Sequence, residues 1–227
     1  MAQVDHLVIA ASTLEEGVAW CERTLGITPN PGGEHPLMGT HNRLFSIASA
    51  QYPKAYFEII AINKVAVCAR KQGLKRWFDL ENEALKQQLK QSGPQLIHFV
   101  ASTPRAVPAM QALAALGIDR GELLEASRMT PHGVLSWKIT VRADGQRLMN
   151  GTLPTLIEWG DVHPSSNMTD SGITLQSLTA SQPDAQALRA AYAAIGLQGV
   201  TVSQGPANLT ATLQTSRGLV TLESRGA

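Results

Sequence analysis

The pattern of hydrophobic and polar positions changes along the chain between one typical of strands and one typical of helices. Thr13 and Glu16 form a capping box that predicts the start of a helix, and Gly26 predicts its end. The predicted elements are an apolar strand over 5–11, a helix with hydrophobic residues at helical spacing over 14–25, and strands over 43–48 and 55–62. The first part of the chain therefore predicts a strand–helix–strand unit.

The same order of patterns occurs twice more. The second copy has predicted strands over 95–101, 134–141 and 153–159, a helix from Pro104 to Gly117 capped by Thr103, and a turn at Asp144-Gly145. The third copy has predicted strands over 173–178, 208–214 and 219–223 and a helix from Pro183 to Gly196. The three helices end on similar tripeptides, namely Leu25-Gly26-Ile27, Leu116-Gly117-Ile118 and Ile195-Gly196-Leu197. This repetition indicates one structural unit used three times.

Two complete units and a shorter third one predict an α+β protein built from repeated βαβββ modules, whose curved mixed sheets surround a cleft. Residues 1–165 are expected to hold the paired modules, at 1–62 and 94–160, with a helical insertion at 63–93. Residues 171–227 are expected to form the third, partial module, which follows a linker rich in Pro, Ser, Asn and Gly.

Composition narrows the class of partner. The formal net charge is +1 with 16% charged residues, which argues against a nucleic-acid partner or a basic membrane-binding face. Cys21 and Cys68 define no disulfide framework. The N-terminus runs directly into a strand with no signal sequence, and no apolar run approaches membrane-spanning length, so the cytoplasm is the expected location.

The segment Gly32–Leu44, with Gly-Thr-His-Asn at its centre, resembles the glyoxalase-like domain family of the vicinal oxygen chelate superfamily. Three further segments fit the same pattern: Asp5–Ile9, Tyr56–Ile60 and Leu156–Gly160. The resemblance covers nearly the whole chain and implies paired βαβββ modules around a shared cleft. The superfamily includes glyoxalases, epimerases, ring-cleaving dioxygenases, thiol transferases and drug-sequestering proteins, so the fold does not select a function.

Four polar residues interrupt otherwise apolar strands: His6, Glu58, His98 and Glu158. A buried carboxylate needs a cation or strong hydrogen bonds, and a set of two imidazoles and two carboxylates suits a divalent metal such as Zn, Ni, Co, Mn or Fe(II). The resemblance implies metal ligands on the first and fourth strands of each module, and the four residues resemble the ligand set of glyoxalase I. Such a metal would act as a Lewis acid, with Glu58 or Glu158 moving the proton. Satisfied polar groups inside strands are the alternative, and a slip of one residue in strand register would turn His98 to the other face.

Other residues are candidates for ligand contact. The resemblance places His41 and Asn42 near the cleft, although bonding from loop to strand backbone would also explain them. Trp159 is a candidate ligand platform or a core residue. Arg43, Arg128 and Lys138 could hold an anionic substrate, but surface charge explains each one singly. His132 and His163, each beside a proline, are expected in loops.

Three functional hypotheses remain open at this point. The first is a metal-assisted lyase, isomerase or dioxygenase acting on a small oxygenated metabolite. The second is a metal-free protein of the bleomycin-resistance type that binds or sequesters a small molecule. The third is a scaffold whose cleft is filled by its own side chains. The faces of the modules also leave room for a homodimer.

Overall fold

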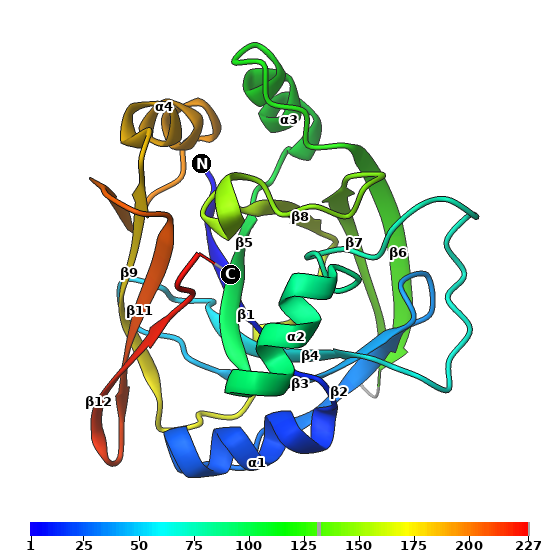
Figure 1. The fold of residues 1–227 in the computed structure, drawn as a ribbon, viewed down its shortest axis with the longest axis vertical. Helices are drawn as coiled ribbons and strands as arrows, with labels where there is room; N and C mark the ends of the chain where they lie inside the picture. The colour runs from blue at the N-terminus through cyan, green and yellow to red at the C-terminus, as the bar shows by residue number, and fades with distance from the viewer. Residues whose placement is uncertain (131–132, 227) are drawn as a thin grey trace.

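The computed structural model describes residues 1–130 and 133–226, which form one eight-stranded sheet and one four-stranded sheet (Figure 1). The first module consists of β1 (Gln3–Ala10), α1 (Leu14–Leu25), β2 (Asn30–His35), β3 (Thr40–Ser46) and β4 (Tyr56–Ile62). The second consists of β5 (Gln95–Ser102), α3 (Ala106–Ala114), β6 (Glu122–Thr130), β7 (Gly133–Val141) and β8 (Thr155–Trp159). The third unit consists of β9 (Thr174–Gln182), α4 (Ala185–Ile195), β10 (Val200–Gln204), β11 (Asn208–Thr215) and β12 (Gly218–Glu223).

The first two modules share the eight-stranded sheet, in the order β2-β3-β4-β1-β5-β8-β7-β6. In each module the first strand is parallel to the last, β1 to β4 and β5 to β8. The antiparallel pairing of β1 with β5 joins the modules at the centre of the sheet. This arrangement confirms the predicted α+β fold of repeated βαβββ modules.

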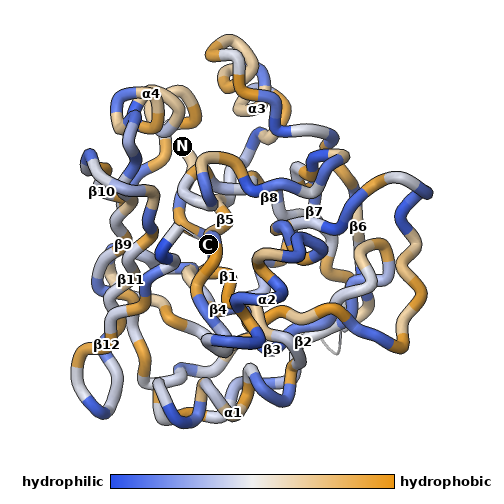
Figure 2. The backbone as a smooth tube through the Cα atoms, viewed as in Figure 1, coloured by the Kyte–Doolittle hydropathy of each residue, from blue (hydrophilic) through white to orange (hydrophobic). Residues whose placement is uncertain are grey.

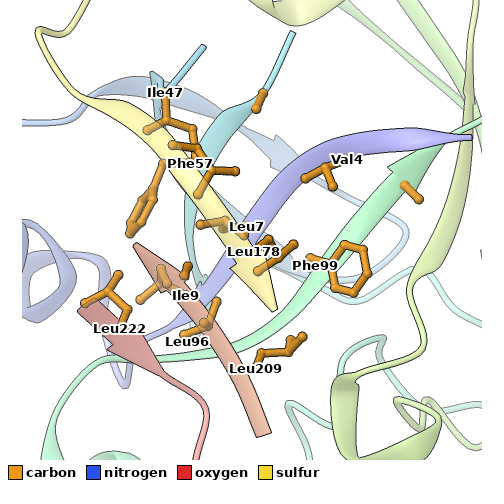
Figure 3. Packing of buried hydrophobic residues seen from close by; sticks show 14 of the residues in the cluster. Val4, Leu7, Ile9, Ile47, Phe57, Leu96, Phe99, Leu178, Leu209 and Leu222 are labelled. Carbon is orange, nitrogen blue, oxygen red and sulfur yellow. The ribbon is translucent and has the colours of Figure 1, made fainter. Parts of the chain in front are cut away.

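The third unit keeps the order of elements but not the strand pairing. Its sheet has the order β10-β9-β11-β12, so β9 is parallel to its second strand and not to its last. Figure 3 shows hydrophobic side chains of this unit, including Leu178, Leu209 and Leu222, packed against Leu7, Ile9, Leu96 and Phe99 of the central strands. The third unit therefore covers one face of the large sheet, the face opposite the cleft.

The segment between the modules fills part of the other face. The helical pattern predicted for it holds only at its end, in α2 (Glu83–Ser92), which Asn82 caps and which buries Leu85 and Leu89. Residues 63–82 are irregular. Trp77, Phe78 and Leu80 of this irregular part pack with α2 against the sheet. In Figure 1, α2 accordingly lies between the central strands and strands β6 and β7.

Two other element boundaries differ from the prediction. The N-caps are Arg105 for α3 and Asp184 for α4, so both helices begin later than expected. Asp144 lies in a turn, but β7 and β8 are joined by a longer connection that contains a short 3₁₀ helix at Met149–Gly151; a second one follows at Pro164–Asn167. Hydrophobic residues occur along the central strands β1 and β5 (Figure 2). Within the described residues, no helix has the length and apolar character needed to cross a membrane.

Candidate functional site

A β-bulge in β1 brings two polar residues to the cleft. Opposite β5, Val4 pairs with Ala101 and His6 with Val100, so Asp5 is the extra residue of β1. Side chains normally alternate along a strand, but a bulge lets two successive side chains leave on the same side. Val4 and Leu7 accordingly both join the core on the far face, and Asp5 and His6 lie together toward the cleft.

His6 lies between two carboxylates. Its Nδ1 is 2.7 Å from Asp5 Oδ1, and its Nε2 is 3.5 Å from Glu58 Oε2 of β4. Burial by itself lowers the pKa of His6, but the hydrogen bonds to Asp5 and Glu58 and their negative charges override it and raise this pKa to about 9. The ring also stacks on Tyr56 at a centroid distance of 4.5 Å. His6 is therefore an imidazolium at neutral pH.

Asp5 is fully buried and holds three ring N–H groups around its carboxylate. Besides His6, it accepts hydrogen bonds from Trp159 Nε1 at 2.9 Å and from His163 Nε2 at 3.0 Å. The Ser165 backbone N–H donates to His163 Nδ1, so the ring proton of a neutral His163 is on Nε2. Burial raises the pKa of Asp5, but the hydrogen bonds from His163 and His6 outweigh it and lower this pKa, which keeps Asp5 ionised.

Asn42 of β3 holds the other oxygen of Glu58. Its Nδ2 donates to Glu58 Oε1 at 2.6 Å, and its Oδ1 accepts from the Gly33 backbone N–H at 2.7 Å. Burial raises the pKa of Glu58, but the hydrogen bond and charge of His6, with help from Asn42, bring the net shift downward. His35 of β2 lies 3.4 Å from Asn42 Nδ2, and burial lowers its pKa to about 4. Glu58 is therefore a carboxylate and His35 a neutral ring.

These groups line a cavity with aromatic and aliphatic walls. The polar end is formed by His6, His35, Asn42 and Glu58, and the walls include Tyr56, Trp77, Phe78, Leu135, Trp137 and Trp159. The space between these groups is about 40 Å³. Leu44, Arg128, Leu135 and Pro164 also line a second cavity of about 240 Å³, so the two spaces adjoin.

The structure brings together only two of the four residues proposed as metal ligands. His6 and Glu58 face each other, whereas His98 is fully buried with both ring nitrogens engaged. His98 Nε2 accepts from the Thr155 backbone N–H at 3.1 Å, and its Nδ1 donates to the Gly151 carbonyl at 2.7 Å. Burial lowers the pKa of His98 well below its usual value. His98 is thus a neutral structural residue.

Glu158 points away from the cleft. Along β8, Ile157 and Trp159 line the cavity, so alternation directs Glu158 to the opposite face. There its Oε2 accepts a hydrogen bond from the Ala106 backbone N–H at 2.6 Å, at the start of α3. The expectation that Glu158 shares a metal, or moves a proton, with Glu58 assumed the same register for both fourth strands, and the structure shows different ones.

The other candidates divide in the same way. Asn42 and Trp159 line the cavity, whereas His41, next to Asn42 on β3, lies within the electrostatic reach of Glu15 on α1, on the other side of the sheet. Glu15 also interacts with Arg43, and Lys138 pairs with Glu125 at 3.3 Å. Arg128 is the basic candidate that lines the cavity. His163 follows β8 as expected of a loop residue, and His132 lies outside the described residues.

The residues present do not fit the metal centre that the resemblance implies. Across residues 1–130 and 133–226, no group of three or more His, Cys, Asp or Glu side chains is arranged to hold a metal ion. Of the four proposed ligands, His98 has both ring nitrogens bonded to Gly151 and Thr155, and Glu158 is bonded at the start of α3 on the opposite face. The cleft chemistry is therefore that of an ionised Asp–His–Glu chain.

Comparison with known proteins identifies the family. The model of a family described as a glyoxalase-like domain matches residues 4–196, so the chain belongs to that family, as its sequence motifs indicate. A comparison with curated proteins gave no significant match. Among solved structures, a hypothetical protein from Staphylococcus aureus has a TM-score of 0.60 and 11% identity, covering 91% of this chain and 88% of its own. A methylmalonyl-CoA epimerase from Mycobacterium tuberculosis has a TM-score of 0.39 and 14% identity, covering 69% of this chain and 85% of its own.

Asp5, His35 and His163 lie at the candidate site, although the sequence patterns did not place any of the three in the cleft. Asp5 stands next to His6, and strict alternation places it on the wrong face because a bulge leaves no mark in the hydrophobic pattern. An Asp-His pair inside a strand that is otherwise apolar is the available clue, since a buried charge of either kind needs a partner. His35 belongs to a polar strand without a pattern, and His163 follows the last strand of the sheet.

Proposed function

We propose that this protein binds a small oxygenated metabolite in the cleft without a metal ion. The observation that supports the proposal is the buried His6–Glu58 pair at the end of a cavity with apolar walls, which adjoins a larger cavity of about 240 Å³. Such cavities with a few convergent polar groups are typical of small-molecule sites. His6 would donate from Nε2 to a carbonyl oxygen, and Glu58 would accept a hydrogen bond from a neighbouring hydroxyl.

The charges and hydrogen bonds around His6 and Glu58 support this role. Asp5 neutralises His6 on its far side, and Asn42 holds Glu58 in place, so the two ionised groups are oriented before a ligand arrives. Hydrogen bonds to ionised groups are about twice as strong as neutral ones, and orientation in advance lowers the entropy lost on binding. The pair would thus select molecules with two adjacent oxygens.

A neutral probe tests this function. 2-Hydroxyacetophenone has adjacent hydroxyl and carbonyl oxygens, and acetophenone lacks the hydroxyl. Calorimetry should show tighter binding of the hydroxy ketone by roughly tenfold, the value of one good hydrogen bond. The preference should persist in excess chelator and disappear in Glu58→Gln and His6→Gln. Glu158→Gln, which changes the same residue type outside the cleft, should keep it.

Two outcomes would contradict the proposal. One is a metal content near one ion per chain in protein expressed with ample metal, lost in Glu58→Gln. The other is equal binding of the two ketones by the unaltered protein. Circular dichroism of each variant separates loss of the site from loss of the fold.

The same pair also favours proton transfer as a second candidate function. A carboxylate beside a cationic hydrogen-bond donor can take a proton from the carbon next to a carbonyl while the donor stabilises the oxyanion. Proton NMR of 2-hydroxyacetophenone in D₂O should then show exchange of the hydrogens next to the carbonyl, faster with the protein than with Glu58→Gln. Equal rates with both proteins would exclude this activity for the probe.

A further inference from the structure

Arg128 lies where the two cavities adjoin and is half-buried, with two of its nitrogen atoms unused as donors. Its Nε and Nη1 atoms are inaccessible to solvent and have no hydrogen-bond partner among the residues that the structure describes. Along β6, Leu124, Ala126 and Arg128 are half-buried, whereas the residues between them are exposed. The guanidinium therefore faces the two adjoining cavities and not the outer surface.

Leaving such donors without a partner is costly. A buried donor with no acceptor has lost its hydrogen bonds to water without gaining others, and the loss is greater when the donor carries charge. Lys138, on the neighbouring strand β7, shows the contrasting case, because it faces outward and pairs with Glu125. The unpaired guanidinium of Arg128 thus calls for an acceptor with negative charge that the described residues do not supply.

The opposite strand is shaped to admit this guanidinium. A Cβ at Gly33 of β2 would lie 1.4 Å from Arg128 Nη1, so any other residue there would displace the end of the arginine. Gly33 also donates its N–H to Asn42 Oδ1, the amide that holds Glu58. One glycine therefore connects the position of Arg128 to the polar end of the cleft.

From these observations we infer that Arg128 forms a carboxylate subsite, and that the ligand of the cleft is an organic acid. This inference rests on the proposed function of the cleft. A carboxylate would accept two parallel hydrogen bonds from the guanidinium. Leu44, Leu135, Pro164 and Trp137 would contact an apolar body, and the oxygens near its other end would reach His6 and Glu58.

Benzoate and benzamide provide the test, because they share one shape and differ in charge. Calorimetry should show benzoate binding at least roughly tenfold more tightly than benzamide, since the pair with arginine is charged. In Arg128→Met this preference should vanish, and in Arg128→Lys part of it should remain. Gly33→Ala should reduce the preference for benzoate, because the added methyl group displaces the end of Arg128. The unfolding midpoint should stay nearly unchanged, since the arginine side chain is flexible.

Several outcomes of this calorimetry would contradict the carboxylate subsite. Equal binding of benzoate and benzamide, no benzoate binding at millimolar concentration, or a preference that survives Arg128→Met would each overturn the carboxylate subsite. If inorganic phosphate bound as tightly as benzoate, the proposal that the ligand is an organic acid would be wrong. Glu58→Gln should not alter the preference for benzoate, so the subsite and the proposed binding of adjacent oxygens can fail independently.

Discussion

His6 on β1 and His98 on β5 occupy corresponding places in the two modules that build the eight-stranded sheet. Around His6 the neighbours are two carboxylates, Asp5 and Glu58, and the ring is charged. Around His98 they are the Gly151 carbonyl and the backbone and hydroxyl of Thr155, and the ring is neutral. The repeat thus places a histidine at the same backbone position in both modules. The charge of each ring depends on its hydrogen-bond partners, which differ.

The paired glutamates differ for a reason of register. Glu58 on β4 faces the cleft, whereas Glu158 on β8 lies on the opposite face and caps α3. The first module therefore has a polar cleft end, and the second contributes apolar walls from β7 and β8, including Ile139 and Ile157. Sequence symmetry between repeats predicts equivalent ligand sets only where the strand registers also agree.

Removing the negative charge of Asp5 is expected to have the largest effect on stability. In Asp5→Asn the amide would turn its own donors toward one of three ring N–H groups, and His6 would lose a counter-ion. Breaking a buried ion pair in this way costs about 3–5 kcal/mol. Urea unfolding should report this loss, with Asp161→Asn, an exposed position, changing stability by less than about 0.5 kcal/mol. A loss of stability below about 1 kcal/mol would mean that the ionised Asp5, His6 and Glu58 do not set the first module apart from the second.

The pH dependence of stability should separate the two histidines. The folded pKa of His6, about 9, lies above its usual 6.5, so its contribution is complete below pH 6.5 and is lost as the pH rises through about 9. The shift corresponds to roughly 3 kcal/mol. His98, with a lowered pKa, acts in the opposite direction, and its contribution is lost as the pH falls below 6.5.

Urea unfolding between pH 6 and 10 measures the first effect. The stability difference between the unaltered protein and His6→Gln should shrink by about 3 kcal/mol across this range. NMR titration of the ring proton gives the pKa of His6 directly. A midpoint at or below 6.5 would show that Asp5 and Glu58 do not hold the proton.

Much of the fold follows from the sequence because buried strands and capped helices leave regular patterns. Three strands were not predicted, namely β2, β6 and β10, and each is the second strand of its unit and lies at an edge of its sheet. An edge strand pairs on one side only. In Asn30–His35, for example, every side chain is exposed or only half-buried, so the strand leaves no apolar pattern.

The site was predictable in part for related reasons. His6, Glu58 and Trp159 were candidates because polar or aromatic side chains stand out in apolar strands, whereas only the family resemblance placed Asn42 near the cleft. Asp5 required knowledge of a bulge, and His98 and Glu158 required the pairing of β5 and β8 with their neighbours. These features arise from long-range contacts, which a local pattern does not contain.

Glu158→Gln should have the smallest effect and tests the second half of the comparison. Arg105, the N-cap of α3, forms no side-chain capping bond, so Glu158 satisfies an amide at this helix start in its place. Loss of the charge near the positive end of the helix should cost about 1 kcal/mol. Urea unfolding measures it against Glu122→Gln, an exposed change on β6. The opposite result would be weaker binding of 2-hydroxyacetophenone in Glu158→Gln, as in Glu58→Gln, with stability unchanged. Glu158 would then face the cleft, and the two modules would not differ in the way proposed.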